Sequence, residues 1–458
     1  MTITEEIFRA YDIRGIVRNA LTPDVVQLIG QAFATEALSQ HQKTVVIGRD
    51  GRLSSAELAN RLSQGLQAGG CDVIDIGMVP TPVLYYATHK LNTGTGIMVT
   101  GSHNPPEYNG LKMLIAGNTL YGEGIKALYR SITENRLNTG SGAYTELDIV
   151  PDYVDTIVND IKLEKPLNIA VDCGNGVAGV LATELFSRLG CKVTELFCDV
   201  DGNFPNHHPD PSKPENLLDL KKAIKENGLD LGLAFDGDGD RVGILDDRQN
   251  ILWADRQMML YAADVLKRKP GAQIIFDIKS TSNLTAYIKN LGGEPLMWKT
   301  GHSFIKAKMK ETGAELAGEM SGHIFFKERW FGFDDGLYGA ARMLEIVSQH
   351  KEPSSAIFEK LPDACNTPEL QIHFDKEGEH YRFMEKFIKQ SLFEQAEIVT
   401  IDGIRVNYAH GWGLIRPSNT TPSLVLRFEA NNENTLSEIQ HIFRRQLLAV
   451  DSTLQLPF

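Results

Sequence analysis

The sequence predicts an α/β protein with three related mixed α/β domains followed by a smaller α+β domain. Three observations favour this fold. The chain has 458 residues, of which 42% are hydrophobic and 23% charged, and this is too long for one hydrophobic core. A unit of strand, polar loop and helix occurs three times along the first part of the chain. Beyond about residue 363 the pattern changes to alternating strands and a final helix.

The repeated unit begins with a short apolar strand, at residues 45–47, 169–171 and 274–276. Each strand enters a polar loop, then a helix that ends at glycine, then a second strand. Glycine is favoured there because the residue after a helix commonly takes a left-handed backbone conformation. A strand–helix–strand unit implies parallel strands joined by a right-handed crossover. We therefore expect a parallel pair of strands in each of the three domains.

A further apolar strand follows each unit and ends in a polar, glycine-containing loop, at residues 100–104, 236–241 and 318–323. Ligands bind α/β sheets at the carboxyl ends of the strands. The three loops are therefore candidates for one functional site. The repeats predict domains at residues 1–147, 148–250, 251–362 and 363–458.

Charge and composition restrict the partners that we expect. The formal net charge of -13 argues against a general nucleic-acid surface. No apolar run approaches the roughly 20 residues that a membrane helix needs, and the first residues do not resemble a signal peptide. The five cysteines are odd in number and scattered, which favours free thiols in a reducing compartment. We expect a cytoplasmic protein that binds neither nucleic acid nor a membrane.

The loop with Asp236, Asp238 and Asp240 is the strongest local signal of chemistry. Alternating aspartates bring three carboxylates to one side of a tight loop, and such oxygen ligands suit Mg²⁺ or Ca²⁺ rather than zinc. An EF-hand is disfavoured because Arg241 stands where its glycine is needed and a strand replaces its first helix. A solvated acidic turn is the simpler alternative. A phosphate oxygen is a natural fourth ligand, and Arg241 could meet the same phosphate.

Ser102 lies on a polar loop just after the apolar run at residues 96–99. Gly101 permits a tight backbone, and Pro105 and Pro106 stiffen the exit from the loop. A serine held on such a loop is a candidate for covalent chemistry. Taken alone, however, Thr-Gly-Ser is more often an ordinary turn between a strand and a helix. The case for Ser102 therefore depends on the other motifs.

Two further glycine-containing stretches allow alternative interpretations. Gly174, Gly176 and Gly179 match a dinucleotide-binding fingerprint, but the equivalent loops of the other two units lack it, so close helix–strand packing is the better account. Residues 411–422 join two alternating strands at 404–408 and 424–428. Their arginine, hydroxyls, amide and backbone N–H groups favour an oxyanion clamp, and a long hairpin loop is the alternative.

The motifs together resemble the α-D-phosphohexomutase superfamily, in its bacterial phosphomannomutase/phosphoglucomutase branch. The resemblance covers essentially the whole chain, in the order FRAYDIRG, TGSHNPPEYNGLK, DGDGDR, WKTGHSFIK, GEMSGHIFFKERWFGFDDG and RPSNTTP. It implies four domains around a central cleft. It also implies an isomerase that interconverts hexose 1-phosphate and hexose 6-phosphate, of mannose or glucose, through a phosphoserine and a bisphosphorylated sugar.

The resemblance also implies roles for residues that would otherwise be read as surface charges or structural polar groups. Ser102 would carry the phosphoryl group, and one of its phosphate oxygens would complete the Mg²⁺ site of Asp236, Asp238 and Asp240. The positions near the reacting phosphate or sugar are Arg14, His103, Lys112, Arg241, His302 and His323. The sugar-hydroxyl ligands are Glu319 and Ser321, and the clamp for the other phosphate is Arg416, Ser418, Asn419 and Thr420, assisted by Tyr11 and Lys279.

Several alternatives stay open at this point. Phosphoglucosamine mutases of the same superfamily usually carry glutamine within the loop where this chain has Met320. A Mg²⁺-dependent sugar phosphatase or an inactive sugar-phosphate binding protein would use similar anion sites. Residue patterns do not rank mannose against glucose, nor do they choose the general base. We expect hexose phosphates as ligands, hexose 1,6-bisphosphate as activator and intermediate, and a monomer.

Overall fold

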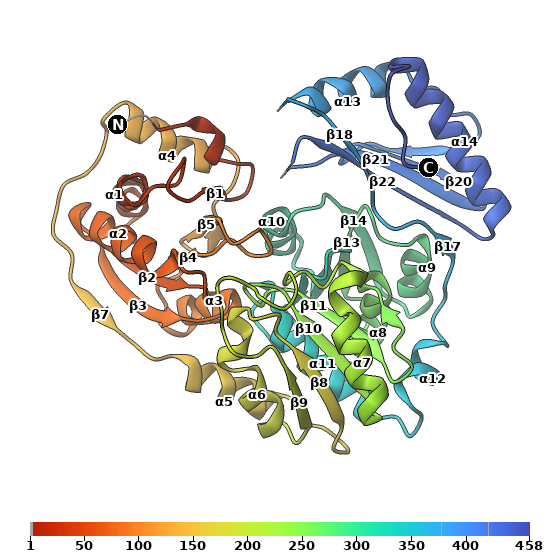
Figure 1. Cartoon of the computed structure of the whole chain (residues 1–458), viewed down its shortest axis with the longest axis horizontal. Coiled ribbons are helices and arrows are strands. Elements are labelled where there is room, and N and C mark those ends of the chain that lie inside the picture. Colours follow the sequence, from red (N-terminus) through yellow and green to blue (C-terminus); the bar gives the residue numbers. More distant parts are fainter. Residues whose placement is uncertain (1–2, 377, 420) are drawn as a thin grey trace.

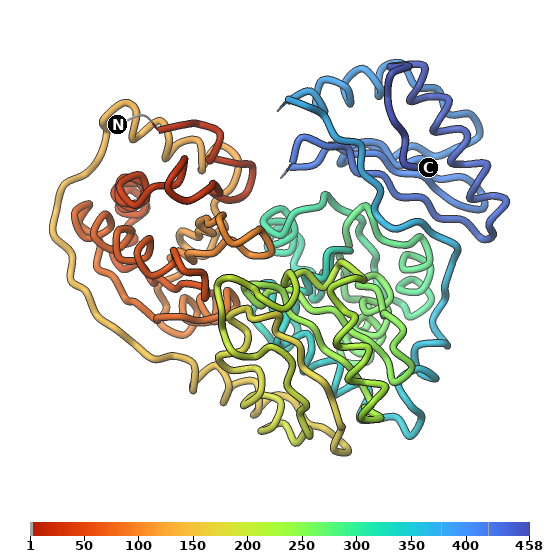
Figure 2. The backbone as a smooth tube through the Cα atoms, viewed as in Figure 1, coloured from red at the N-terminus to blue at the C-terminus, as the bar shows by residue number. Residues whose placement is uncertain are grey.

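The protein has four domains, as the sequence predicts (Figure 1). Each domain contains one β-sheet, and the four sheets follow one another along the chain. The computed structural model describes residues 3–376, 378–419 and 421–458. Figure 2 shows the chain passing from a red and orange first lobe, through yellow, green and teal, to a blue last lobe. The precise domain boundaries stay predictions. In the described part of the chain, no helix is both long and apolar enough to cross a bilayer.

The sheet of domain I is mixed and has the strand order β1-β5-β4-β2-β3-β7, with β6 paired to β5. Its strands are β1 (Ile13–Ile16), β2 (Thr44–Arg49), β3 (Asp72–Met78), β4 (Gly96–Val99), β5 (Tyr108–Ile115), β6 (Asn118–Thr119) and β7 (Tyr144–Glu146). Its helices are the 3-10 helix η1 (Glu5–Ile7), α1 (Pro23–Ser39), α2 (Ser55–Ala68), α3 (Thr81–Lys90) and α4 (Glu123–Thr133). Strand β4 is buried along its whole length, so the loop that follows it starts from the core.

Domain II has a five-stranded sheet in the order β12-β11-β10-β8-β9. Its strands are β8 (Asn168–Asp172), β9 (Lys192–Leu196), β10 (Leu231–Phe235), β11 (Val242–Asp246) and β12 (Ile251–Leu252). Its helices are α5 (Val150–Asp160), η2 (Val177–Val180), α6 (Ala182–Arg188), η3 (Pro214–Leu217) and α7 (Leu218–Asn227). Strand β10 is also wholly buried, and it runs directly into the aspartate loop.

Domain III has a four-stranded sheet in the order β14-β13-β15-β16. Its strands are β13 (Gln273–Asp277), β14 (Glu294–Trp298), β15 (Leu316–Gly318) and β16 (Ile324–Phe326). Its helices are α8 (Ala254–Arg268), α9 (Ser282–Asn290), α10 (His302–Thr312), α11 (Gly336–Ser348) and α12 (Ser354–Phe358). Helix α11 is buried along its whole length.

The three predicted strand–helix–strand units are confirmed. Strand β2 pairs in parallel with β3, β8 with β9, and β13 with β14. The glycines predicted to end the helices have positive φ, with values of 100° at Gly70, 97° at Gly190 and 77° at Gly292. These conformations strain a residue that has a Cβ atom, which explains the choice of glycine.

Domain IV is an antiparallel sheet in the order β17-β22-β21-β20-β19, with β18 on β22. Its strands are β17 (Cys365–Asn366), β18 (Leu370–His373), β19 (Glu397–Val399), β20 (Ile404–Tyr408), β21 (Gly411–Pro417) and β22 (Ser423–Ala430). Its helices are α13 (Glu379–Gln390) and α14 (Glu433–Val450).

One expectation for domain IV is wrong. Residues 411–417 form strand β21 instead of the start of a long loop, so the connection to β22 is short. The glycines there are not turn residues. A Cβ atom on Gly413 would lie 2.4 Å from the ring of Phe443, and one on Gly411 would lie 2.8 Å from Ile439, so glycine lets α14 pack closely on the strand.

Candidate active site

Ser102 lies on the loop after β4, as the sequence predicts, and it is buried. Its backbone has a positive φ of 48°, which is uncommon for a residue other than glycine and is held by the surrounding contacts. The Ser102 N–H donates to Thr100 Oγ1 at 2.8 Å, and the Gly101 N–H donates to Asp50 Oδ2 at 3.1 Å. The loop is therefore rigid at the serine.

Arg52 holds the rest of this loop, and sequence reasoning missed its role. It is buried, and its Nε pairs with Asp50 at 3.2 Å. Its guanidinium donates to four backbone carbonyls, those of Ser102 (2.7 Å), Asn104 (2.6 Å), Pro105 (2.6 Å) and Tyr108 (3.0 Å). A Cβ atom on Gly101 would lie 2.4 Å from this guanidinium, so glycine is needed there. The only sequence signal was a basic residue in the polar loop after β2.

The aspartate loop after β10 lies against the serine loop. Ser102 Oγ donates to Asp236 Oδ2 at 3.0 Å. A Cβ atom on Gly237 would lie 2.3 Å from the Ser102 carbonyl oxygen, so the two loops approach closely only because this residue is glycine. Lys112, on β5, places its Nζ 2.7 Å from Asp238 Oδ2 and 2.5 Å from Asp240 Oδ2. Although burial opposes the charge, these two carboxylates raise the pKa of Lys112.

The three aspartates could hold a metal ion. Their oxygens lie close together and all three residues are fully buried. Asp238 Oδ1 and Asp240 Oδ1 have no hydrogen-bond partner within the described residues. Burial, together with Asp240 and Asp238, raises the pKa of Asp236 to about 7 against the opposing effect of Arg241. This excess of buried negative charge fits a hard divalent cation.

Arg241 and Arg14 add positive charge beside the serine. Arg241 Nε donates to Asp236 Oδ2 at 3.0 Å, and its Nη1 lies 3.4 Å from Asp210. Its Nη2 is buried and has no hydrogen-bond partner among the described residues. Arg14, on β1, pairs with Asp12 at 2.6 Å and also contacts the side-chain oxygen of Asn104. Both guanidinium groups are therefore held in place before any ligand binds.

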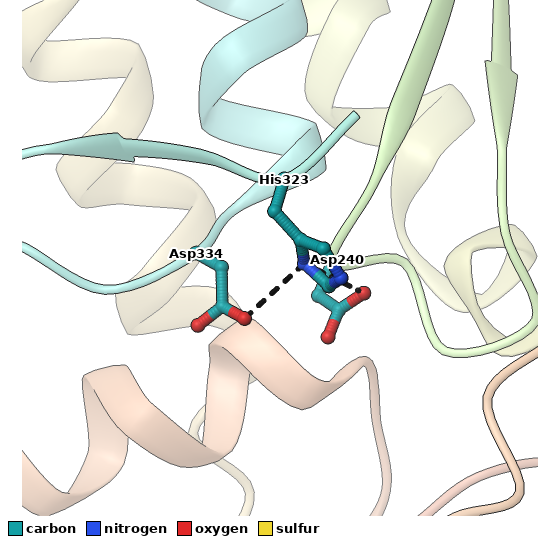
Figure 3. Close-up of side chains that lie close together, drawn as sticks. All are labelled: Asp240, His323 and Asp334. Carbon is teal, nitrogen blue, oxygen red and sulfur yellow. Dashed lines mark ion pairs between the residues drawn. The ribbon is translucent and has the colours of Figure 1, made fainter. Parts of the chain in front are cut away.

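His302 and His323 lie with their rings stacked, 5.6 Å apart, next to Asp334. Figure 3 shows His323 between Asp334 and Asp240, with its Nδ1 3.3 Å and 3.6 Å from their oxygens. His302 Nδ1 is 3.5 Å from Asp334. Burial lowers the pKa of His302, assisted by Lys306. In His323 the two carboxylates outweigh burial and raise the pKa. The pKa values of the two rings are thus shifted in opposite directions.

Asp334 was missed as an individual residue, although its motif was noted. It accepts from Lys306 Nζ at 2.8 Å, which balances its charge. Together with Asp240 and His323 it forms a second group whose geometry could hold a metal (Figure 3). Because Lys306 already offsets the charge of Asp334, this group has a smaller excess of negative charge than the three aspartates, and a cation would stabilise it less.

His103 also lies beside Ser102, with its Nδ1 3.3 Å from the serine Oγ. Burial and the charge of Arg241 lower the pKa of His103 well below the ordinary value. A neutral imidazole at this distance can exchange a proton with the serine oxygen.

Glu319, Ser321 and Tyr11 lie at the middle of the site. Glu319 Oε1 accepts from the Gly301 N–H at 2.5 Å, and burial, with Asp277 adding, raises the pKa of Glu319 to about 7. Ser321 is half-buried in the same loop. Tyr11 packs on the ring of His302 at 5.5 Å. Burial raises the pKa of Tyr11, and the negative charge of Asp12 adds to the rise, while Arg14 and Arg416 oppose it.

The predicted clamp lies at the end of β21 in domain IV. Arg416 Nε donates to Asp402 at 2.8 Å, and its Nη2 has no hydrogen-bond partner among the residues described. Ser418 is buried and Asn419 is close to it, while Thr420 lies outside the described residues. Lys279 of domain III pairs with Glu369 of domain IV at 2.5 Å, and the charge of Arg416 acts on its pKa. The clamp is therefore assembled from two domains.

The dinucleotide interpretation loses its structural basis. A Cβ atom on Gly179 would lie 1.9 Å from the Cys198 carbonyl oxygen, and one on Gly176 would lie 3.0 Å from that of Gly237. These glycines therefore allow close packing against β9 and the aspartate loop, as the sequence analysis favoured. The five cysteines are free thiols, also as expected.

Four family models match the chain in order. They are described as phosphoglucomutase/phosphomannomutase alpha/beta/alpha domain I at residues 5–139, domain II at 151–249, domain III at 253–365, and the C-terminal domain at 373–446. Together they match most of the described sheets, including the loops that carry Ser102, Asp236, Glu319 and Arg416.

Curated relatives and solved structures agree with the models. A phosphomannomutase/phosphoglucomutase of Pseudomonas aeruginosa is 55% identical and covers 100% of this chain and 98% of its own length. A phosphoglucomutase of Neisseria gonorrhoeae is 52% identical over 97% of each chain. The crystal structure of a phosphoglucomutase/phosphomannomutase family protein from Burkholderia thailandensis is 52% identical, covers 100% of both chains and superposes with a TM-score of 0.94.

Proposed function

Because the chain belongs to the phosphoglucomutase/phosphomannomutase family, we propose that it interconverts hexose 1-phosphate and hexose 6-phosphate through a phosphoserine at Ser102. One observation carries the proposal. The Ser102 hydroxyl donates to Asp236 and stands among the aspartates, Lys112 and Arg241, on a loop held by Arg52. This arrangement suits phosphoryl transfer, in which catalysis depends on positioning and on stabilisation of negative charge.

The reaction would proceed in two transfers. The phosphoryl group leaves Ser102 Oγ and joins the free hydroxyl of a hexose monophosphate, which loses its proton and becomes a bisphosphate. The sugar turns end for end in the site. The other phosphoryl group then returns to Ser102 Oγ and leaves the isomeric monophosphate. His103, at 3.3 Å from the serine oxygen, and the pair His302 and His323 are the candidates for moving the proton.

Asp236, Asp238 and Asp240, with an oxygen of the phosphoserine, would hold Mg²⁺. When bound, the ion would neutralise charge on the transferring phosphoryl group. Lys112 would orient Asp238 and Asp240, since it contacts both. Arg241 and Arg14 would meet phosphate oxygens with their unpartnered nitrogens, which are buried and lack a hydrogen-bond acceptor within the described chain.

The other end of the sugar would be held by domain IV. Arg416, Ser418 and Asn419, together with the predicted Thr420, would bind the phosphate that is not transferred, and Lys279 and Tyr11 would assist. Glu319 and Ser321 would hold the sugar hydroxyls. When ionised, the Glu319 carboxylate only accepts hydrogen bonds, and when protonated it gains an O–H donor; its pKa of about 7 places that change near neutral pH.

The alternatives have less support. Relatives at 52–55% identity are named phosphomannomutase/phosphoglucomutase or phosphoglucomutase, which disfavours the phosphoglucosamine mutase alternative. A sugar phosphatase would need a water positioned against the phosphoserine, and the relatives named above are mutases, which also disfavours this alternative. We further propose a cytoplasmic monomer with hexose 1,6-bisphosphate as activator. Light scattering on a sizing column should report about the chain mass of 50.8 kDa.

A coupled assay tests the proposed function. Glucose 1-phosphate and mannose 1-phosphate are supplied with Mg²⁺, with and without hexose 1,6-bisphosphate, and both the 6-phosphates and inorganic phosphate are measured. We expect 6-phosphate without stoichiometric phosphate release, activation by the bisphosphate, and loss of turnover on the order of 10³-fold or more in Ser102→Ala. Ser39→Ala, at the end of α1, is the matched control. Unchanged turnover in Ser102→Ala would disprove the phosphoserine.

A further inference from the structure

A cavity of about 750 Å³ lies between domains I and III, and its lining contains none of the candidate active-site residues within the described chain. We call it the interdomain pocket. It is lined by the turn between β5 and β6, by α3, by α10 and by the loop at residues 327–333. Figure 1 shows α10 beside β5 at this junction. A cavity of this size holds a ligand of several hundred daltons.

Two lysines of the interdomain pocket lack an acidic partner. Lys310 Nζ donates to the neutral Asn118 side-chain oxygen at 2.7 Å, and Lys327 Nζ donates to the Gly313 carbonyl at 3.2 Å. Within the residues that the structure describes, neither has a carboxylate at ion-pair distance. The acidic residue on the lining, Glu311, is already paired with Lys308 at 2.6 Å. The interdomain pocket is therefore positively charged in a chain of net charge -13.

The same pocket exposes aromatic rings. Phe331 is 42% exposed and Tyr121 is 38% exposed. Phe331 packs against His89, with ring centroids 5.1 Å apart, and against Phe333 at 6.0 Å, and these two rings lie 5.9 Å from each other, so the three rings form a compact cluster. A flat ring could pack on the exposed part of Phe331. The lining thus offers a stacking surface and uncompensated cations in one cavity.

We propose that the interdomain pocket binds a nucleoside phosphate, with its base on Phe331 and its phosphate between Lys310 and Lys327, and that this lowers turnover. Both halves of such a ligand are matched: aromatic side chains stack on any base, and ammonium groups attract phosphate. An anion without a ring would leave Phe331 exposed, and a neutral ring would leave the lysines without a counter-charge.

A chain of contacts connects the interdomain pocket to the active site. Lys306 lines the pocket and lies over the ring of Tyr85 at 4.1 Å. Its Nζ also donates to Asp334 Oδ1 at 2.8 Å, and Asp334 in turn contacts His302 and His323. Lys310 and Lys306 lie four residues apart on α10 (His302–Thr312), so a phosphate held by Lys310 would also attract the Lys306 ammonium group in competition with Asp334. Such a ligand would therefore disturb the histidines without entering the catalytic cleft, so it should reduce kcat at saturating substrate.

The binding test uses the full-length enzyme and calorimetry. AMP is titrated into protein in EDTA with saturating glucose 1-phosphate, so that the catalytic cleft is filled. We expect binding that is weakened about tenfold by Lys310→Ala or Lys327→Ala, and about fivefold or more by Phe331→Ala. These three side chains are exposed, so the variants should fold. Lys289→Ala, an exposed lysine on α9, is the matched control and should bind AMP normally.

Adenosine and inorganic phosphate serve as half-ligands, and each should bind much more weakly than AMP. The proposal is overturned if AMP does not bind when the cleft is filled, if the pocket variants bind it as the parent does, or if either half-ligand binds as tightly. In the coupled assay with fixed free Mg²⁺, AMP should lower kcat of the parent, and Phe331→Ala should need about fivefold or more AMP for the same reduction. Binding without a change in kcat would overturn the coupling to the active site.

Discussion

The reacting end of the site, with Ser102 and the aspartate loop, and the clamp end, with Arg416, are supported in different ways. Domains I, II and III share one apolar cluster, which includes Met98, Phe235 and Ile324 from the three strands next to the site loops. Domain IV has an apolar cluster of its own. The reacting atoms are thus fixed by a common core, while the clamp is carried by a separately packed unit.

Domain IV docks on domain III mainly through polar contacts. Arg405 donates to the carbonyls of Ile278 and Ser280 at 2.6 Å and 2.8 Å, and Arg427 pairs with Asp255 at 3.2 Å. Apolar contact is limited to a small cluster around Trp412. Polar contacts of this kind can be exchanged for water, whereas a shared core cannot. In the proposed mechanism this difference would serve two needs, since Ser102 would require exact placement while the clamp would adapt to a sugar that binds in two orientations.

The largest effect is expected at the reacting end, from Arg52→Ala. Its loss leaves four carbonyls and Asp50 without their buried partner, so the Ser102 loop should relax. We expect kcat to fall about 100-fold with a small change in KM, because positioning errors act on the transition state. Coupled-assay kinetics measure this, and circular dichroism checks folding. Arg61→Ala, a partly exposed arginine on helix α2 just after the loop that carries Arg52, is the control. A normal kcat in Arg52→Ala would show that Arg52 is not needed to hold the Ser102 loop in position.

At the clamp end, Arg416→Ala should act mainly on substrate binding. One phosphate ligand is lost, while Ser102 and the aspartates are untouched, so KM for glucose 1-phosphate should rise about 10- to 50-fold. The fall in kcat should be smaller than that of Arg52→Ala. Arg445→Ala, an exposed arginine of the same domain, should behave as the parent. If Arg416→Ala instead showed a large fall in kcat at unchanged KM, the clamp end would behave like the reacting end, and the proposed difference between the two would be wrong.

Protons should compete with the metal at the reacting end. The pKa of Asp236 is raised to about 7, so its carboxyl binds a proton below that pH and the metal loses a ligand. The affinity for the metal should therefore be high above pH 7 and decrease as the pH falls below 7. From pH 8 to pH 6 the Mg²⁺ concentration for half-maximal activity should rise about tenfold. Asp219→Asn, at an exposed aspartate on α7, should keep this dependence, and a parent enzyme whose Mg²⁺ requirement is the same at pH 8 and pH 6 would contradict the prediction.

The smallest effect is expected from the docking surface of domain IV. Arg405 stacks on Trp412 at 3.7 Å, and Arg405→Ala removes that contact and two interdomain hydrogen bonds. The radius of gyration from X-ray scattering should increase slightly, and KM should rise about three- to fivefold. Saturating substrate should restore the compact form. An unchanged radius together with unchanged KM would mean that other contacts hold domain IV.

Much of this architecture was predictable from local patterns. The repeats at residues 45–47, 169–171 and 274–276 predicted three parallel units, because glycine after a helix and a short apolar strand are local signals. The aspartate loop was found because its spacing depends on neighbouring residues alone. Residues 411–417 were expected in a connecting loop but form strand β21, because the glycines there allow α14, which lies elsewhere in the sequence, to pack closely on the strand. Spacing along the chain carries no signal of such a contact.

The sequence alone therefore indicated which loops carry chemistry: the serine, the aspartates and the clamp each lie in a recognisable short motif. Only the tertiary structure decided how they are held. Arg52 reaches its four carbonyls, Asp334 its two histidines, and Lys279 its partner Glu369, across loops or domains. A local motif reflects the backbone and chemistry of a few adjacent residues, whereas burial and ion pairing depend on residues far apart along the chain that folding brings together.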